Sequence, residues 1–177
     1  MTTTHRELGD HIRAFAKTIS VGPLGIVELK PEPWASVDFC FANAAQKAEL
    51  DGGTPICGWV FHYRVLARNQ TLGYLIARHH AVWRRPDGLL FDVTPERPVE
   101  KHRAYGPKDG WIVFLADPLA DPVVTDCALG PLPSKFYALT DDPELVAHVQ
   151  RLSQDEDATV RKIYAEGVTP DPEGTKQ

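Results

Sequence analysis

The segment Pro86-Asp87-Gly88 constrains the fold of this chain more than any other, because it separates two stretches rich in apolar and aromatic residues. Proline suits the first central position of a type I turn, and glycine suits the left-handed position that follows it. These three residues therefore predict the loop of a β-hairpin, with Arg85 and Leu89 flanking the loop.

The register of this hairpin brings a histidine and an aspartate onto one face. Val82 then lies opposite Asp92 and His80 opposite Thr94, and alternate residues of a strand share a face. Diagonal neighbours have Cα atoms roughly 7–8 Å apart, so the imidazole of His80 can meet the carboxylate of Asp92. His79 points to the opposite face, and a shift of one strand by one residue would exchange the two histidines.

Cys40 precedes this pair in the chain and lies near the start of a predicted helix. Ser36 or Asp38 can cap the helix, which continues to about Leu50, and Asp51-Gly52-Gly53 ends it. The unpaired N–H groups and the dipole of a helix N-terminus favour a thiolate and can stabilise an oxyanion.

A thiol, an imidazole and a carboxylate are the parts of a cysteine nucleophile, its general base and the group that orients the base. The sequence therefore predicts a catalytic triad of Cys40, His80 and Asp92. Each residue also has a structural alternative, namely a buried thiol, a hydrogen-bonded sheet histidine and a strand-end carboxylate. His62 and His102 are alternative bases, although no partner carboxylate is apparent for His62 from spacing.

The segments around the three residues resemble a known family. Cys40 at a helix start, His80-Ala81-Val82-Trp83 and Asp92-Val93-Thr94-Pro95 are similar to the transglutaminase-like branch of the papain-like cysteine enzymes. In that family a nucleophilic cysteine opens a helix, a later strand carries His-Ala, and the next strand carries an aspartate. Gly58-Trp59-Val60 resembles the strand between the helix and the histidine strand, and Cys40-Phe41-Ala42-Asn43 is one residue short of the Cys-Phe-x-x-Asn pattern of arylamine N-acetyltransferases.

The resemblance covers about Trp34 to Asp117 and implies an α+β, papain-like fold in which the helix that carries Cys40 packs on an antiparallel β-sheet. It also implies acyl transfer through the thiol, as amide hydrolysis, deamidation or transamidation of a peptide, a protein or a small amide or thioester. The candidate substrate-binding residues are Trp34, Trp59 and Asn43. For the tryptophans the alternative is the hydrophobic core, and for Asn43 it is solvent or a loop cap.

A non-catalytic binding or accessory protein on the same scaffold is the alternative function. It is motivated by the absence of a glutamine within helix reach before Cys40, where papain-like enzymes carry a side-chain oxyanion donor. A cysteine on such a scaffold would be buried or unreactive.

Length and composition bound the remaining possibilities. A chain of 177 residues predicts one domain, here 1–166, followed by a disordered tail at 167–177. The net charge of −5 argues against nucleic-acid or anionic-membrane partners.

The isolated Cys40, Cys57 and Cys127 match no zinc spacing, so we predict no metal and no cofactor. The polar start of the chain predicts a cytoplasmic location with reduced thiols, and the oligomeric state stays open.

Periodicity and turn signals predict the other elements. Consecutive strands joined by short turns predict an antiparallel sheet, and a surface loop is expected at Asp117–Leu132. The expected helices are His5–Thr18, Asp142–Leu152 and Asp155–Ala165, and the expected strands are Ile56–Ala67, Leu72–Arg85, Gly88–Val93 and Gly110–Ala116.

Overall fold

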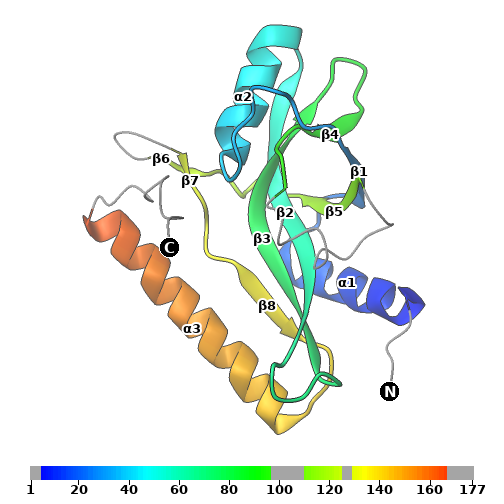
Figure 1. Ribbon diagram of the computed structural model, residues 1–177, viewed down its shortest axis with the longest axis vertical. Coiled ribbons are helices and arrows are strands. Elements are labelled where there is room, and N and C mark those ends of the chain that lie inside the picture. The colour runs from blue at the N-terminus through cyan, green and yellow to red at the C-terminus, as the bar shows by residue number, and fades with distance from the viewer. Residues whose placement is uncertain (1–4, 97–109, 125–128, 167–177) are drawn as a thin grey trace.

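The computed structural model describes residues 5–96, 110–124 and 129–166, which fold into three helices, a six-stranded mixed sheet and a separate two-stranded sheet (Figure 1). The predicted α+β class is therefore confirmed. The helices are α1 (His5–Ile19), α2 (Cys40–Asp51) and α3 (Pro143–Glu166). The strands are β1 (Leu24–Leu29), β2 (Thr54–Val65), β3 (Gly73–Arg84), β4 (Leu90–Asp92), β5 (Trp111–Ala116), β6 (Val123–Val124), β7 (Leu129–Gly130) and β8 (Lys135–Ala138).

The large sheet closes on itself. Its strand order is β2-β5-β1-β4-β3-β8, and β2 also pairs with β3, so five strands form a ring from which β8 extends. β1 is parallel to β4, whereas the other pairs are antiparallel. The expectation of a purely antiparallel sheet is therefore wrong. β1 was not predicted, because Gly22, Pro23 and Gly25 obscure its pattern, and it inserts between β4 and β5, which lie much later in the chain.

The β3–β4 hairpin has the predicted turn and register. Trp83 lies opposite Phe91 and Arg84 opposite Leu90. The N–H of Arg85 donates to the carbonyl of Leu89 at 2.9 Å across the loop. Gly88 has φ +91°, the left-handed conformation that glycine adopts without a steric penalty. Both the turn prediction and the register that depends on it are confirmed.

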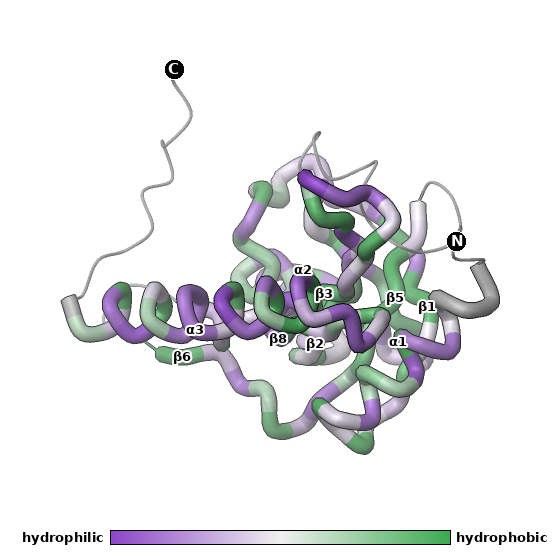
Figure 2. The backbone as a smooth tube through the Cα atoms, turned by 90° about the horizontal axis from the view of Figure 1, so that it is seen from below, coloured by the Kyte–Doolittle hydropathy of each residue, from purple (hydrophilic) through white to green (hydrophobic). Residues whose placement is uncertain are grey.

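Helices cover the sheet on several sides, and each contributes apolar residues to the core. Figure 1 shows α1 and α3 on opposite sides of the long β2–β3 hairpin. α2 lies beside the end of the hairpin that is farthest from the β2–β3 turn (Figure 1). Figure 2 shows hydrophilic and hydrophobic residues alternating along α3, as expected for a helix that packs one face on the sheet. Side chains from four strands contact one another inside the ring, namely Val27, Val60, Val82, Ile112 and Phe114. The cluster beside α1 contains Ile12, Phe15, Ala16, Trp59, Phe61, Leu75 and Ala77.

Two helix predictions need correction. α2 begins at Cys40 itself, with Phe39 at the N-cap and no side-chain cap, so neither Ser36 nor Asp38 caps it. Asp38 has φ +68°, which a right-handed helix cannot contain. The two short helices expected near the C-terminal end are one helix, α3, because the polar residues around 153–155 do not interrupt a helix packed on β8.

The prediction also missed three short strands, and some predicted features lie outside the described residues. β8 was missed because prolines precede this short strand, and the segment expected to be a loop contains β6 and β7. His102, Cys127 and the tail 167–177 lie outside the residues that the structure describes.

Candidate active site

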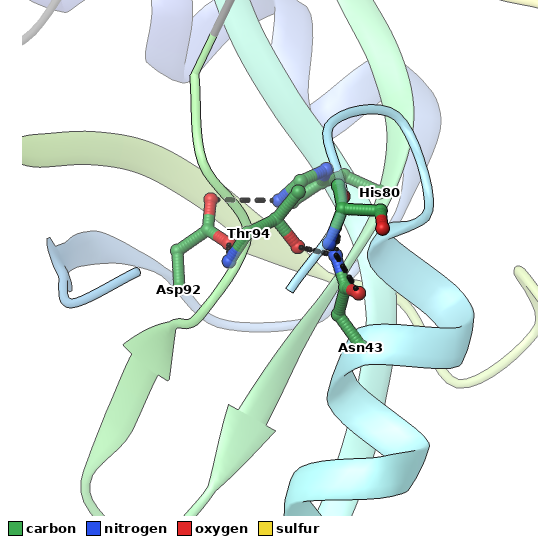
Figure 3. A network of polar contacts seen from close by, with 5 residues as sticks. Asn43, His80, Asp92 and Thr94 are labelled. Carbon is green, nitrogen blue, oxygen red and sulfur yellow. Dashed lines mark hydrogen bonds and ion pairs between the residues drawn. The ribbon is translucent and has the colours of Figure 1, made fainter. Parts of the chain in front are cut away.

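His80 and Asp92 form a direct contact between neighbouring strands. The Nε2 atom of His80, on β3, lies 2.8 Å from Oδ2 of Asp92, the last residue of β4 (Figure 3). The other carboxylate oxygen of Asp92 accepts a hydrogen bond from the N–H of Thr94 at 3.0 Å. The side chains are 16% and 5% exposed, respectively, so the pair is largely shielded from water. The turn after β4 therefore holds the carboxylate in position toward the imidazole.

Cys40 is the third residue of the predicted triad. It is the first residue of α2 and is 7% exposed. Burial opposes a charge on His80, but the charges of Asp92 and Cys40, and hydrogen bonds to both side chains, hold the pKa of His80 well above its ordinary value. Because Nε2 contacts Asp92, Nδ1 is the ring nitrogen available to Cys40, whose side chain contributes to the raised pKa of His80.

Asn43 ties the helix to the segments around the triad (Figure 3). Its side-chain Nδ2 donates to the carbonyl of Ser36 at 2.7 Å and to Oγ1 of Thr94 at 3.2 Å. Its Oδ1 accepts the N–H of Ser36 at 3.2 Å. Asn43 is 4% exposed, so these bonds form in a shielded environment. The side chain predicted to bind substrate thus links the start of α2 to the segment that follows Asp92.

The N-terminus of α2 offers backbone donors next to the thiol. The first-turn N–H groups of an α-helix have no acceptor within the helix. No side-chain cap satisfies them here, and the carbonyl of Phe39 accepts the N–H of Asn43 at 2.8 Å, which marks the first helical bond. An oxyanion that forms at Cys40 would lie beside these donors.

The two predicted substrate tryptophans lie in different settings. Trp59 is 2% exposed, packs in the cluster beside α1 and donates from Nε1 to Oδ2 of Asp117 at 2.9 Å. Trp34 is half-buried in the turn that leads to α2. The structure brings neither tryptophan into a recorded contact with the three triad side chains.

His79 has a structural role that the sequence did not reveal. As predicted, it points away from His80, and its ring packs near Phe41 and Trp59. Nε2 donates to the carbonyl of Ala120 at 2.7 Å, and Nδ1 accepts the N–H of Leu132 at 2.8 Å. Burial lowers the pKa of His79, which agrees with a neutral ring. His79 therefore links Ala120 and Leu132 through one side chain, which packs on Phe41 of α2.

His62 is a poor candidate for the general base. Burial, and then the charges of Arg78 and Arg64, lower its pKa to about 3. Its Nδ1 is buried and has no hydrogen-bond partner among the described residues. So weak a base cannot take the proton of a thiol efficiently near neutral pH.

A cleft of about 360 Å³ is lined by residues that lie close in the chain to two triad members, but by none of the triad residues themselves. Asp38 precedes Cys40 by two residues, and Arg78 precedes His80 by two, so it shares the face of β3 that carries His80. The lining residues are Asp38, Ile76, Arg78, Ser134, Phe136 and Glu156. A second pocket, of about 410 Å³, lies at the opposite end of α2, around Gly53 and the tip of the β3–β4 hairpin.

Comparisons with protein-family models, with curated proteins and with solved structures found no match for this chain. Within the described segments, no group of three or more His, Cys, Asp or Glu side chains is arranged to hold a metal ion. No helix in the same segments is long and apolar enough to cross a membrane.

Proposed function

We propose that this protein is a thiol-dependent acyl-transfer enzyme with a papain-like fold of the transglutaminase-like branch. The observation that carries the proposal is the contact of 2.8 Å between His80 Nε2 and Asp92 Oδ2, with the Cys40 side chain near enough to help raise the pKa of His80. The placement of the thiol on the first residue of a helix that packs on β2 and β3 supports it. The chain order of cysteine, histidine and aspartate agrees with that branch.

In the proposed reaction, Cys40 Sγ attacks the carbonyl carbon of an amide or thioester while Nδ1 of His80 holds the thiol proton. The carbonyl π electrons move to oxygen, and first-turn N–H groups of α2 stabilise the oxyanion. When the tetrahedral species collapses, the bond to the leaving group breaks. His80 donates its proton to the departing nitrogen or sulfur, which leaves an acyl group on Sγ.

The second half of the reaction releases the acyl group. Water or an amine attacks the thioester carbonyl, and His80 takes a proton from that nucleophile. The bond to Sγ then breaks, and the proton returns to the thiol. Water gives hydrolysis or deamidation, and an amine gives transamidation. Throughout, Asp92 Oδ2 orients the imidazole and stabilises its charged form.

Alkylation of the native protein with iodoacetamide, from about pH 5 to about pH 9, tests the proposal. Mass spectrometry would follow Cys40, Cys57 and Cys127 separately. We expect Cys40 to react fastest, already near neutral pH, and to lose this advantage in the His80→Ala variant. Slow and equal labelling of the three cysteines would contradict an activated thiol.

The low exposure of Cys40 favours a second candidate, a binding or accessory protein in which this thiol is structural. Cys40 is 7% exposed and packs with Phe41, Ala44 and Ala81. This candidate predicts that Cys40→Ala changes neither partner binding nor any activity that is discovered. A Cys40→Ala protein that loses acyl transfer but stays folded would exclude it.

A further inference from the structure

The cleft lined by Asp38 and Arg78 lies where β3 lacks a strand partner on one side. β3 pairs with β8 through Tyr74–Ala77 and with β4 through Trp83 and Arg84. His80 lies between these two paired segments. The cleft is lined from β3, from β8 and the residue preceding it, from α3, and from the loop before α2. Asp38 and Arg78 each precede a triad residue by two positions, so a molecule bound there would extend toward Cys40 and His80.

The lining of the cleft combines an apolar wall with an excess of negative charge. Ile76 and Phe136 lie directly opposite each other across the β3–β8 pair and form the wall. The formal charges of Asp38 and Arg78 cancel, so the carboxylate of Glu156 leaves the lining with one net negative charge. Glu156 projects from α3, and one of its oxygens accepts the N–H of Ser134 at 3.0 Å.

The carboxylate of Glu156 has capacity for a further partner. A carboxylate has two oxygens and accepts several hydrogen bonds. Within the described segments, Glu156 makes no ion pair with a lysine, arginine or histidine. The hydrogen bond from Ser134 fixes the side chain in the cleft, so the negative charge is held at a defined place beside the apolar wall.

We infer that this cleft binds a positively charged side chain of the acyl substrate, an amine or guanidinium on an aliphatic stem, with Glu156 as the residue that determines this specificity. The aliphatic stem packs on Ile76 and Phe136, and the charged end meets Glu156. The inference rests on the proposed function, because the bound group is part of the molecule whose carbonyl Cys40 attacks. It adds the chemical class of the substrate.

The test uses charged reagents that modify thiols. Aminoethyl methanethiosulfonate is a cation, sulfonatoethyl methanethiosulfonate is an anion, and methyl methanethiosulfonate is neutral. The rate at Cys40 is measured for each by mass spectrometry on the full chain, and each rate is divided by the rate of the same reagent with a free thiol, 2-mercaptoethanol. The variants are Glu156→Gln, which keeps an acceptor for the N–H of Ser134, and Glu144→Gln, which removes the same charge from an exposed position on α3.

We expect the ratio of the cation rate to the anion rate to exceed one and to fall at least about threefold in Glu156→Gln. Glu144→Gln should leave the ratio unchanged, and added sodium chloride should reduce the ratio of the unmodified protein. A ratio at or below one, or equal effects of the two substitutions, would overturn the inference; rapid labelling by the neutral reagent would then leave the proposed function standing. No labelling of Cys40 by any reagent would overturn both.

Discussion

Asp92 Oδ2 lies 2.8 Å from Nε2 of His80, and the two residues are diagonal neighbours across a hairpin that Pro86-Asp87-Gly88 closes. The other oxygen of the same carboxylate accepts a hydrogen bond from the N–H of Thr94. The orientation of the imidazole therefore depends on the short stretch of chain from His80 to Thr94.

Replacing Asp92 with asparagine should slow alkylation of Cys40 at about pH 6–7 by at least about tenfold. The Asp92 charge favours the imidazolium and raises the pKa of His80 against the effect of burial. Without that charge the ring loses its proton at lower pH and no longer stabilises a thiolate. The measurement is the iodoacetamide rate at Cys40 as a function of pH. Asp87→Asn, at the exposed tip of the same hairpin, is the matched control and should leave this rate unchanged.

Cys57 should be nearly inert in the native protein. Burial, with smaller effects of Asp121 and Cys40, raises the pKa of Cys57 to about 11 from 9.0. Two pKa units reduce the thiolate fraction roughly a hundredfold below pH 9. Mass spectrometry should therefore show slow labelling of Cys57 in native protein and faster labelling after denaturation in urea. Equal rates in the two states would show that the thiol is not shielded.

Substituting His62 with leucine should make the protein less sensitive to acid. His62 has a folded-state pKa of about 3, below its ordinary 6.5, so between these values the unfolded chain binds a proton that the folded chain does not. Stability is therefore lost as the pH falls through this interval, by up to about 5 kcal/mol. Urea unfolding at several pH values measures it. The difference in unfolding free energy between the variant and the unmodified protein should grow in favour of the variant as pH falls.

Replacing Asn43 with alanine should cost about 1–3 kcal/mol of unfolding free energy, because the buried hydroxyl of Thr94 and the backbone groups of Ser36 lose their hydrogen-bond partner. It should also slow the alkylation of Cys40, since the start of α2 loses its tie to the segment after Asp92. Gln46→Ala, on the exposed face of the same helix, is the control for helix propensity. An Asn43→Ala protein with unchanged stability would contradict this role.

Local turn chemistry made the histidine–aspartate pair predictable. A turn of three residues sets the register of its two strands, and the two-residue repeat of a strand then decides which side chains share a face. His80 was distinguished from His79 in this way, and the observed pairing of Trp83 with Phe91 has the same register. The helix that carries Cys40 was predictable in kind, but its first residue was not, because the backbone of Asp38 adopts φ +68°.

Contacts between distant parts of the chain decided the rest. The parallel pairing of β1 with β4 closes the ring, and β8 adds a partner to the first half of β3. The hydrogen bonds of His79 to Ala120 and Leu132, and the link from Asn43 to Thr94, join residues far apart in sequence. Turn geometry depends on adjacent residues, so the sequence alone determined the hairpin and the facing of His80 and Asp92. Only the tertiary structure placed Cys40 at their side and Glu156 in the neighbouring cleft, because those positions depend on the packing of α2 and α3 against the sheet.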